Sequence, residues 1–185
     1  MKDAGEDGVK QIKIQYYKSP IGELLLGSYE NKLCIADMRY RKKRTTIDNR
    51  IQQGLNAEYV EELSEVVTQT IKELEEYFRY KRKEFTIPLL LVGTEFQKSV
   101  WQGLIETPFG TTSSYLALSK RIGNEKAVRA VASANGANCI AILVPCHRII
   151  GSNGDLVGYA GGLDVKKSLL EIESNKIRSL TEEKS

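Results

Sequence analysis

Cysteine and histidine are scarce in this chain of 185 residues, and their scarcity argues against two kinds of site. The three cysteines, Cys34, Cys139 and Cys146, are odd in number and widely spaced, which argues against a disulfide framework. The N-terminal half has only Cys34 and no histidine, which is too few ligands for a closed zinc site. We therefore expect no metal and a reducing compartment.

Long apolar runs are also missing, so no segment has the length that crosses a bilayer. The first ten residues, MKDAGEDGVK, are charged and do not resemble a secretion signal. We expect a cytoplasmic protein of prokaryotic type without a targeting signal. The net charge of +3 is too small to indicate a nucleic-acid partner by itself. Between residues 95 and 150, six basic residues stand against three acidic ones, which is merely compatible with a polyanion.

The N-terminal half has the pattern of a small sheet followed by a helix. Residues 11–38 are β-like, with turns expected at residues 19–22 and at Asn31. Residues 39–44 are the basic run RYRKKR, which indicates either a solvated loop or a phosphate-contacting patch. A helix is predicted over residues 58–80. Its apolar side chains recur at three- and four-residue spacing: Val60, Leu63, Val67, Ile71, Leu74 and Phe78.

A helix-turn-helix pattern marks the C-terminal half. Residues 94–106 have a helical pattern that Pro108-Phe109-Gly110 ends. Two helices are then expected over residues 114–121 and 125–135, with a turn at Gly123-Asn124. The second of these helices is rich in small residues: Ala127, Ala130, Ala132, Ala134 and Gly136. This composition fits a tightly packed internal helix and a smooth helix for a nucleic-acid groove equally well.

The most informative segment is the string LVPCHR, in which Cys146 precedes His147, the only histidine. A thiolate is a strong nucleophile, and a neighbouring base turns a thiol into a thiolate near neutral pH. A free cysteine without such a neighbour is more often a buried structural residue. Residues 139–144 before it are expected to be buried and extended. The glycine-rich residues 158–162 and a last helix over residues 165–173 follow it.

Seven segments of the C-terminal half together resemble one known family. In order they are FQKSVWQGLIETPFG, TTSSY, VRAV, Asn138, ILVPCHRIIGSNG, GYAGG and KKSLLEIE, from about residue 96 to residue 173. Their order and spacing are similar to those of the methylated-DNA–protein-cysteine methyltransferases, the O6-alkylguanine-DNA alkyltransferases. The N-terminal half resembles that family only in outline, through YYKSPIGELLLG, a small sheet and a helix.

The resemblance implies an α+β protein with two domains. Residues 1–92 would form a bracing domain, a small antiparallel sheet with a helix (ribonuclease H-like), in which residues 1–10 are disordered. Residues 93–175 would form a helical winged helix-turn-helix domain for DNA binding and alkyl transfer, and residues 176–185 a frayed tail. The resemblance also implies a monomer that needs no cofactor and binds no membrane.

The activity implied is irreversible transfer of an alkyl group, such as methyl, from O6-alkylguanine in double-stranded DNA (also from O4-alkylthymine) to Cys146. His147 would act as the base through a bridging water, and Glu173 would orient that histidine. Asn138 would hold the turn that carries the site, and Tyr115 would donate a proton to the guanine. A thioether is a poor leaving group, so this methylated-DNA–[protein]-cysteine S-methyltransferase would act once.

The resemblance also assigns residues to the DNA and to the alkyl pocket. Arg129 would fill the gap left by the flipped nucleotide, and the small-residue helix would lie in the minor groove. The residues assigned to DNA contact are Arg129, Tyr115, Lys126, Ala127, Ala130, Ser133 and Ala134. Those assigned to the loop that lines the alkyl pocket are Val144, Pro145, Tyr159, Ala160, Gly161 and Lys166.

Two positions depart from the family pattern. Cys139 stands where the family often has proline, and we expect it to be a buried core residue. Ala160 stands where many relatives have serine, which removes one possible hydrogen bond to the leaving oxygen. Two other functions are considered beside alkyl transfer. A winged-helix module that only binds damage would lack a reactive cysteine, and a Cys-His hydrolase would turn over small esters or peptides repeatedly.

Overall fold

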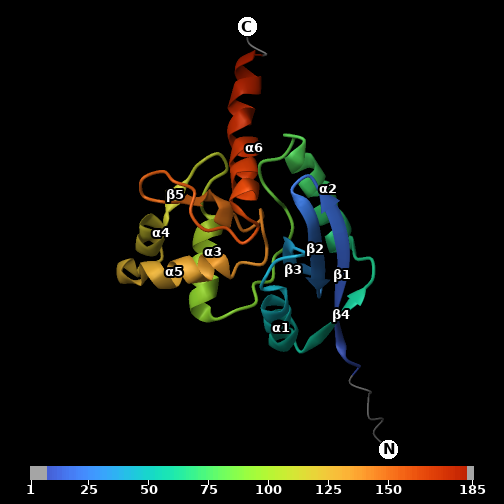
Figure 1. The fold of residues 1–185 in the computed structure, drawn as a ribbon. Coiled ribbons are helices and arrows are strands. Elements are labelled where there is room, and N and C mark those ends of the chain that lie inside the picture. The colour runs from blue at the N-terminus through green and yellow to red at the C-terminus, as the bar shows by residue number, and fades with distance from the viewer. Residues whose placement is uncertain (1–7, 183–185) are drawn as a thin grey trace, which may run out of the picture.

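The computed structural model of the protein describes residues 8–182, with side chains from residue 8 to residue 174. The N-terminal half forms a sheet with two helices, and the C-terminal half forms a group of helices beside it (Figure 1). This arrangement confirms the predicted α+β class. Within the described range, no helix is both long enough and apolar enough to span a bilayer.

Four strands form the sheet, in the order β3-β2-β1-β4. They are β1 (Lys10–Ser19), β2 (Gly22–Tyr29), β3 (Lys32–Met38) and β4 (Ala57–Glu61). The first three pair antiparallel as predicted, and β4 adds a parallel edge strand beside β1. The hairpin turn predicted at Asn31 is confirmed. Glu30 and Asn31 both have positive φ angles, 47° and 63°, as a tight turn between antiparallel strands requires.

The helix predicted over residues 58–80 is wrong in its first part. Residues 57–61 are strand β4, and helix α2 (Glu65–Phe78) begins only after Ser64. The Ser64 hydroxyl accepts a hydrogen bond from the Val67 amide at 3.2 Å, which fixes the start of the helix. Leu63, which the helical spacing had placed on the apolar face, is 72% exposed.

Helix α1 (Arg44–Leu55) forms most of the connection between β3 and β4, and it was not predicted. Only Ile47 and Ile51 are buried in it, so its apolar pattern is weak. Asn56 ends it in a left-handed conformation, with φ 47° and ψ 52°. The helix forms because these two isoleucines pack into the common core and not because of local propensity.

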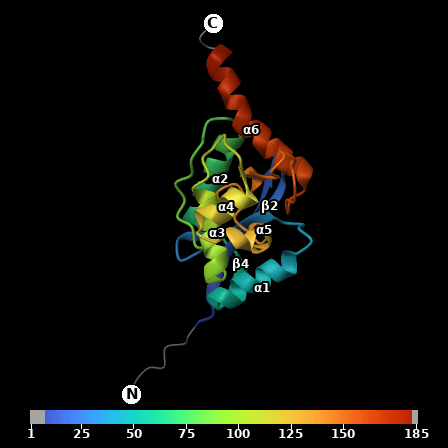
Figure 2. The ribbon, with the colours of Figure 1, turned by 90° about the vertical axis from the view of Figure 1, so that its left-hand side faces the viewer.

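The predicted helix-turn-helix is present in the C-terminal half. Helix α4 (Tyr115–Arg121) is followed by a turn at Gly123, whose φ is 76°, and then by helix α5 (Val128–Gly136). The first residues expected in the second helix, Glu125–Ala127, form a 3-10 turn instead. Helix α3 (Glu95–Ile105) packs against both helices, and all three lie at the front of the view in Figure 2. Its start has a capping box formed by Thr94 and Gln97.

The run at residues 139–144 is buried as predicted, but it is not extended. It makes a single bridge to β3, between Ile140 and Ala36, and then turns. The Val144 amide donates to the Ile140 carbonyl at 2.9 Å, and Ile142 has a φ of 71°. A β-branched residue with positive φ is strained, so the packing around it must impose this turn. The turn delivers the chain to Cys146.

The helix predicted over residues 165–173 is longer at both ends. Helix α6 runs from Leu163 to Glu182, since neither glycine nor proline interrupts residues 163–182. The tail that was expected to fray from residue 176 is therefore helical as far as Glu182, and residues 183–185 lie outside the described part. At the N-terminus of the chain, where residues 1–10 are expected to be disordered, Lys10 already belongs to β1. Residues 1–7 lie outside the described part of the chain.

Candidate active site

Cys146 lies at the start of a short 3-10 helix, η2 (Cys146–Arg148), immediately after the buried turn. Asn138 closes that turn from both sides. Its amide Nδ2 donates to the Val144 carbonyl at 2.9 Å, and its Oδ1 accepts from the Ile140 amide at 3.0 Å. The Cys146 amide in turn donates to the Val144 carbonyl at 2.8 Å. Asn138 therefore sets the backbone path that leads to Cys146, as the sequence predicts for it.

The Cys146 thiol is 6% exposed. Burial raises its pKa above the usual range, and the nearby Asn138 amide and the cations Arg41 and Lys166 offset this only in part. The thiol therefore rests in its protonated form at neutral pH. A base must remove its proton before the sulfur can attack.

His147 and Glu173 form a buried pair beside the cysteine. His147 Nε2 and Glu173 Oε2 are 2.6 Å apart. Burial lowers the pKa of His147 despite the opposing effect of Glu173, so the ring is neutral. An ionised carboxylate only accepts, so Nε2 carries the proton and Nδ1 is left as an acceptor. Within the described residues Nδ1 has no hydrogen-bond partner, so its lone pair remains available as a base.

Two residues that the sequence analysis did not single out complete this pair. Arg148 Nε donates to Glu173 Oε1 at 2.6 Å, and the Tyr77 hydroxyl donates to Glu173 Oε2 at 3.2 Å. Burial alone would raise the pKa of Glu173, but the hydrogen bonds from His147 and Arg148 and the charge of Arg148 lower it below its usual value. The carboxylate is thus ionised. The place of Arg148 next to His147 in the sequence could have indicated its role. No local sequence signal indicates Tyr77, which comes from helix α2.

A groove of about 990 Å³ opens at Cys146. Tyr115 and the glycine-rich residues 158–162 line it, among them Tyr159, Ala160 and Gly161, which the family resemblance assigns to the loop of the alkyl pocket. Tyr115 is half-buried, and a Cβ added at Gly158 would lie 3.7 Å from its hydroxyl oxygen. Burial first, and then the negative charge that Cys146 carries as a thiolate, raise the pKa of Tyr115, so its hydroxyl keeps its proton. The groove thus brings a thiol and a proton donor together.

Lys166 holds the start of the glycine-rich loop, residues 158–162, in place through its buried amine. Its fully buried amine donates to the carbonyls of Ile149 and Val157, the latter at 2.7 Å, and to that of Gly158 at 3.4 Å. Burial lowers the pKa of Lys166, but three carbonyl partners favour the charged amine. Val144 and Pro145, the other residues predicted for the pocket, are buried and do not line the groove.

The exposed face of α5 consists of Arg129, Ala130, Ser133 and Gly136, and Lys126 is exposed just before it. Ser133 and Gly136 also line the groove. Ala127 is half-buried. Ala134 does not fit the predicted DNA contact, because it is 3% exposed and its carbonyl accepts the Trp101 indole N–H at 2.9 Å. The small residues of α5 therefore lie on two faces, one packed against the core and one smooth and exposed.

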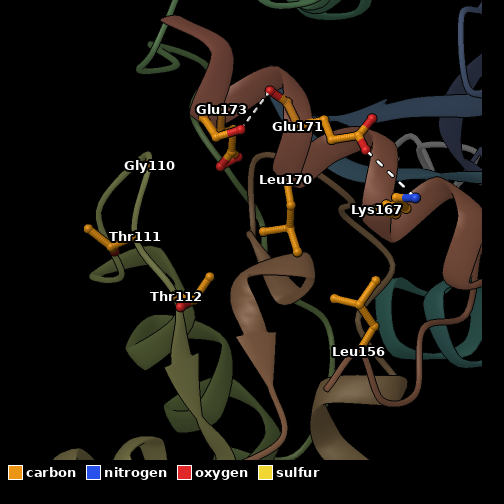
Figure 3. A pocket seen from close by; sticks show the side chains of 9 residues that line it. Gly110, Thr111, Thr112, Leu156, Lys167, Leu170, Glu171 and Glu173 are labelled. Carbon is orange, nitrogen blue, oxygen red and sulfur yellow. Dashed lines mark hydrogen bonds and ion pairs between the residues drawn. The ribbon is translucent and has the colours of Figure 1, made fainter. Parts of the chain in front are cut away.

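Asn135 is a further residue of the groove that the sequence analysis did not find. It is 4% exposed, and its Oδ1 has no hydrogen-bond partner among the described residues. A second and smaller hollow of about 260 Å³ lies between α6 and the turn at residues 110–112 (Figure 3). Glu173 borders this hollow, but Cys146 does not, so the hollow is separate from the groove that reaches the thiol.

Comparisons with known proteins place both halves in one family. The model described as "6-O-methylguanine DNA methyltransferase, ribonuclease-like domain" matches residues 12–91, and that described as "6-O-methylguanine DNA methyltransferase, DNA binding domain" matches residues 95–175. The methylated-DNA–protein-cysteine methyltransferase of Methanosarcina acetivorans is 46% identical over 160 residues, 86% of this chain and 96% of that protein. The corresponding protein of Mycobacterium leprae is 41% identical over 162 residues, 86% of this chain and 90% of that protein.

A solved structure shows the same similarity in three dimensions. The crystal structure of Mycobacterium tuberculosis OGT in complex with DNA matches with a TM-score of 0.77 at 36% sequence identity. The match covers 90% of this chain and 94% of that one. Sequence and fold agree over nearly the whole length, and the chain belongs to the family of the methylated-DNA–protein-cysteine methyltransferases.

Proposed function

We propose that this protein repairs alkylated DNA by moving the alkyl group of O6-alkylguanine, and of O4-alkylthymine, onto Cys146. The observation that carries the proposal is the placement of Cys146 at a groove, next to a neutral His147 that is hydrogen-bonded to an ionised Glu173. A base of this kind can take the thiol proton in a site where burial otherwise keeps the thiol protonated.

The transfer is a single displacement. His147 Nδ1 takes the proton of the thiol through a bridging water. A water is needed because Cys146 and His147 are adjacent in sequence, and the side chains of adjacent residues seldom point in the same direction and touch. The sulfur then attacks the alkyl carbon, the carbon–oxygen bond breaks, and the guanine takes a proton donated by the Tyr115 hydroxyl. A thioether forms on Cys146 and is not displaced again. No cofactor is required, because the protein itself accepts the alkyl group.

The DNA would bind through helix α5 in the minor groove. An alkylated O6 atom inside the duplex cannot reach a buried thiol, so the nucleotide must leave the stack. Arg129 is exposed on α5 and would occupy the gap, while Ala130 and Ser133 allow a close approach to the backbone. Few base contacts suit a repair protein that must act at any sequence.

The domain division and setting belong to the same proposal. Residues 93–175 would bind DNA and carry the chemistry, residues 1–92 would brace them, and the protein would act as a cytoplasmic monomer. The alternative of a module that only binds damaged DNA is disfavoured by the groove at Cys146.

The test is the mass of the intact protein after reaction with duplex DNA that contains O6-methylguanine. We expect one added methylene per protein molecule and no more, however large the excess of DNA. The Cys146→Ala variant should bind the DNA and gain no mass. Repeated turnover, or loss of the methyl group from DNA without a change in protein mass, would contradict the proposal.

A further inference from the structure

We propose that the loop between β3 and α1, residues 39–43, is a second DNA contact in which Lys42 and Lys43 bind phosphate oxygens of the strand that enters the groove. The inference rests on the proposed function, since it names how the N-terminal half would take part in binding the same DNA. Of the two interpretations that the basic run RYRKKR leaves open, a solvated loop and a phosphate-contacting patch, it favours the patch for Lys42 and Lys43. The five cations of residues 39–44 fall into two groups, those that pair with protein groups and those that do not.

Three of the five cations are already engaged with protein groups. Arg39 pairs with Glu23 at 3.2 Å and lies 3.8 Å above the Tyr16 ring. Arg44 pairs with Asp48 at 3.0 Å, and Arg41 pairs with Asp37 at 3.2 Å. Lys42 and Lys43 are exposed and form no ion pair with any described residue. Two adjacent cations thus remain for an outside anion.

Arg41 anchors the loop to the end of helix α5. It is 8% exposed, and its Nη1 donates to the Asn138 carbonyl at 2.9 Å. Its Nη2 donates to the Gly136 carbonyl. Arg50 of α1 donates to the carbonyl between them, Ala137, at 2.9 Å. Two guanidinium groups therefore donate to three successive carbonyls at the negative end of the α5 dipole.

This anchor fixes where the two lysines stand. The side chain of a surface lysine usually samples many positions. The backbone of Lys42 and Lys43, however, directly follows the buried Arg41, which is hydrogen-bonded to the end of helix α5. Figure 2 shows the loop beside α5. A strand that lies along α5 would therefore meet both ammonium groups at a constant distance from the helix. Lysine binds phosphate well as a point charge.

The groove joins this loop to the thiol. Lys42 and Lys43 line it together with Ser133 and Gly136 of α5 and with Cys146. Among its lining residues the only carboxylate is Glu23, which Arg39 neutralises. The groove is therefore positive along the path from the loop to the cysteine. A flipped nucleotide carries a phosphate on each side, so the phosphates flanking it would lie near this rim.

The test compares two double variants in binding unmodified duplex DNA at several salt concentrations. One is Lys42→Gln with Lys43→Gln. The matched control is Lys18→Gln with Lys32→Gln, two exposed lysines of the same half that do not line the groove. The slope of log affinity against log salt is negative, and losing two phosphate contacts makes it less steep by about 1.8. The ratio of the wild-type affinity to that of the Lys42, Lys43 variant should then fall by about 12-fold between roughly 50 and 200 mM salt.

The control variant should keep the wild-type slope. An unchanged slope for the Lys42, Lys43 variant, or an equal change in both variants, would overturn the proposal, because the second result would reflect overall charge alone. Binding to unmodified DNA does not depend on methyl transfer. A protein that binds through these lysines but never gains mass would refute the proposed chemistry and leave this surface standing.

Discussion

Cys139 and Cys146 lie seven residues apart and are almost equally buried, at 4% and 6% exposure. Burial raises the pKa of both thiols, that of Cys139 to about 11. Their surroundings differ in two respects. Cys139 faces strand β3, where its Sγ donates to the Cys34 carbonyl at 3.6 Å, and it does not line the groove. Cys146 lines the groove and has the pair of His147 and Glu173 beside it.

Burial and a raised thiol pKa are shared by both cysteines, so neither property distinguishes Cys146 from Cys139. Access to the groove and a neutral base with a free acceptor nitrogen do. The expectation that Cys139 is a core residue is confirmed by its burial. Removing the carboxylate, the neutral base or its hydrogen bonds one at a time should make the surroundings of Cys146 resemble those of Cys139.

The largest effect is expected for Glu173→Gln, which removes the carboxylate that orients His147. We expect methyl transfer to slow by about 10²- to 10⁴-fold, the usual contribution of general base catalysis. Stability should fall by about 3–5 kcal/mol, because Arg148 loses its buried anionic partner. Single-turnover transfer rates and urea unfolding measure the two effects separately.

Glu171→Gln is the matched control for this variant. Glu171 is two residues away on α6 and exposed, and its ion pair with Lys167 spans 4.0 Å. We expect its transfer rate to equal that of the wild type and its stability to change by less than about 0.5 kcal/mol. Equal transfer rates for the two variants would remove Glu173 from the mechanism.

The second effect is on stability as a function of pH. Burial lowers the folded-state pKa of His147 below about 6.5, its value in the unfolded chain. The unfolded state therefore binds the proton first as pH falls, so the stabilising contribution present above pH 6.5 is lost below it. The loss approaches about 1.4 kcal/mol per pH unit until the folded pKa is reached.

Glu173 acts in the same direction at lower pH, because its folded pKa is also depressed and its contribution disappears as pH falls through that value. Urea unfolding from about pH 8 down to about pH 3 measures both, the His147 effect below about pH 6.5 and the Glu173 effect below about pH 4.5. Since His147 is the only histidine, its ring signals in NMR report the folded pKa directly. A folded pKa above 6.5 would contradict the neutral base.

The smallest effect is expected for Tyr77→Phe. This change removes one of the hydrogen bonds to Glu173 and leaves the ring in place. We expect a loss of about 1 kcal/mol of stability and less than a 10-fold slower transfer. A slowing as large as that for Glu173→Gln would mean that the N-terminal half contributes directly to the chemistry.

The sequence predicted those parts of the site that lie close together in it or that follow a family pattern. Cys146 and His147 are neighbours, and Glu173 follows from the spacing of the last segment. Tyr77, Arg41 and Arg50 reach the site from the N-terminal half through contacts 87 to 97 residues apart in sequence. No local pattern encodes such contacts, so only the folded structure shows them.

The errors in the fold have a similar origin. Val60 has helical spacing relative to the residues of α2, but it pairs with Lys13 of β1. The residues 139–144 look like a strand, yet the Asn138 side chain satisfies the backbone of the turn instead of a neighbouring strand. In the first case a tertiary partner decides between conformations that the local sequence allows, and in the second case a polar side chain a few residues away does.

The most direct test locates the transferred methyl group between the two cysteines. Cleavage after Arg129 and Arg148 leaves Cys139 and Cys146 on one peptide, so the peptide must be fragmented to tell them apart. After reaction with duplex DNA containing O6-methylguanine, we expect the added methylene on Cys146 alone. A methylene on Cys139, or on neither cysteine while the DNA is repaired, would contradict the account.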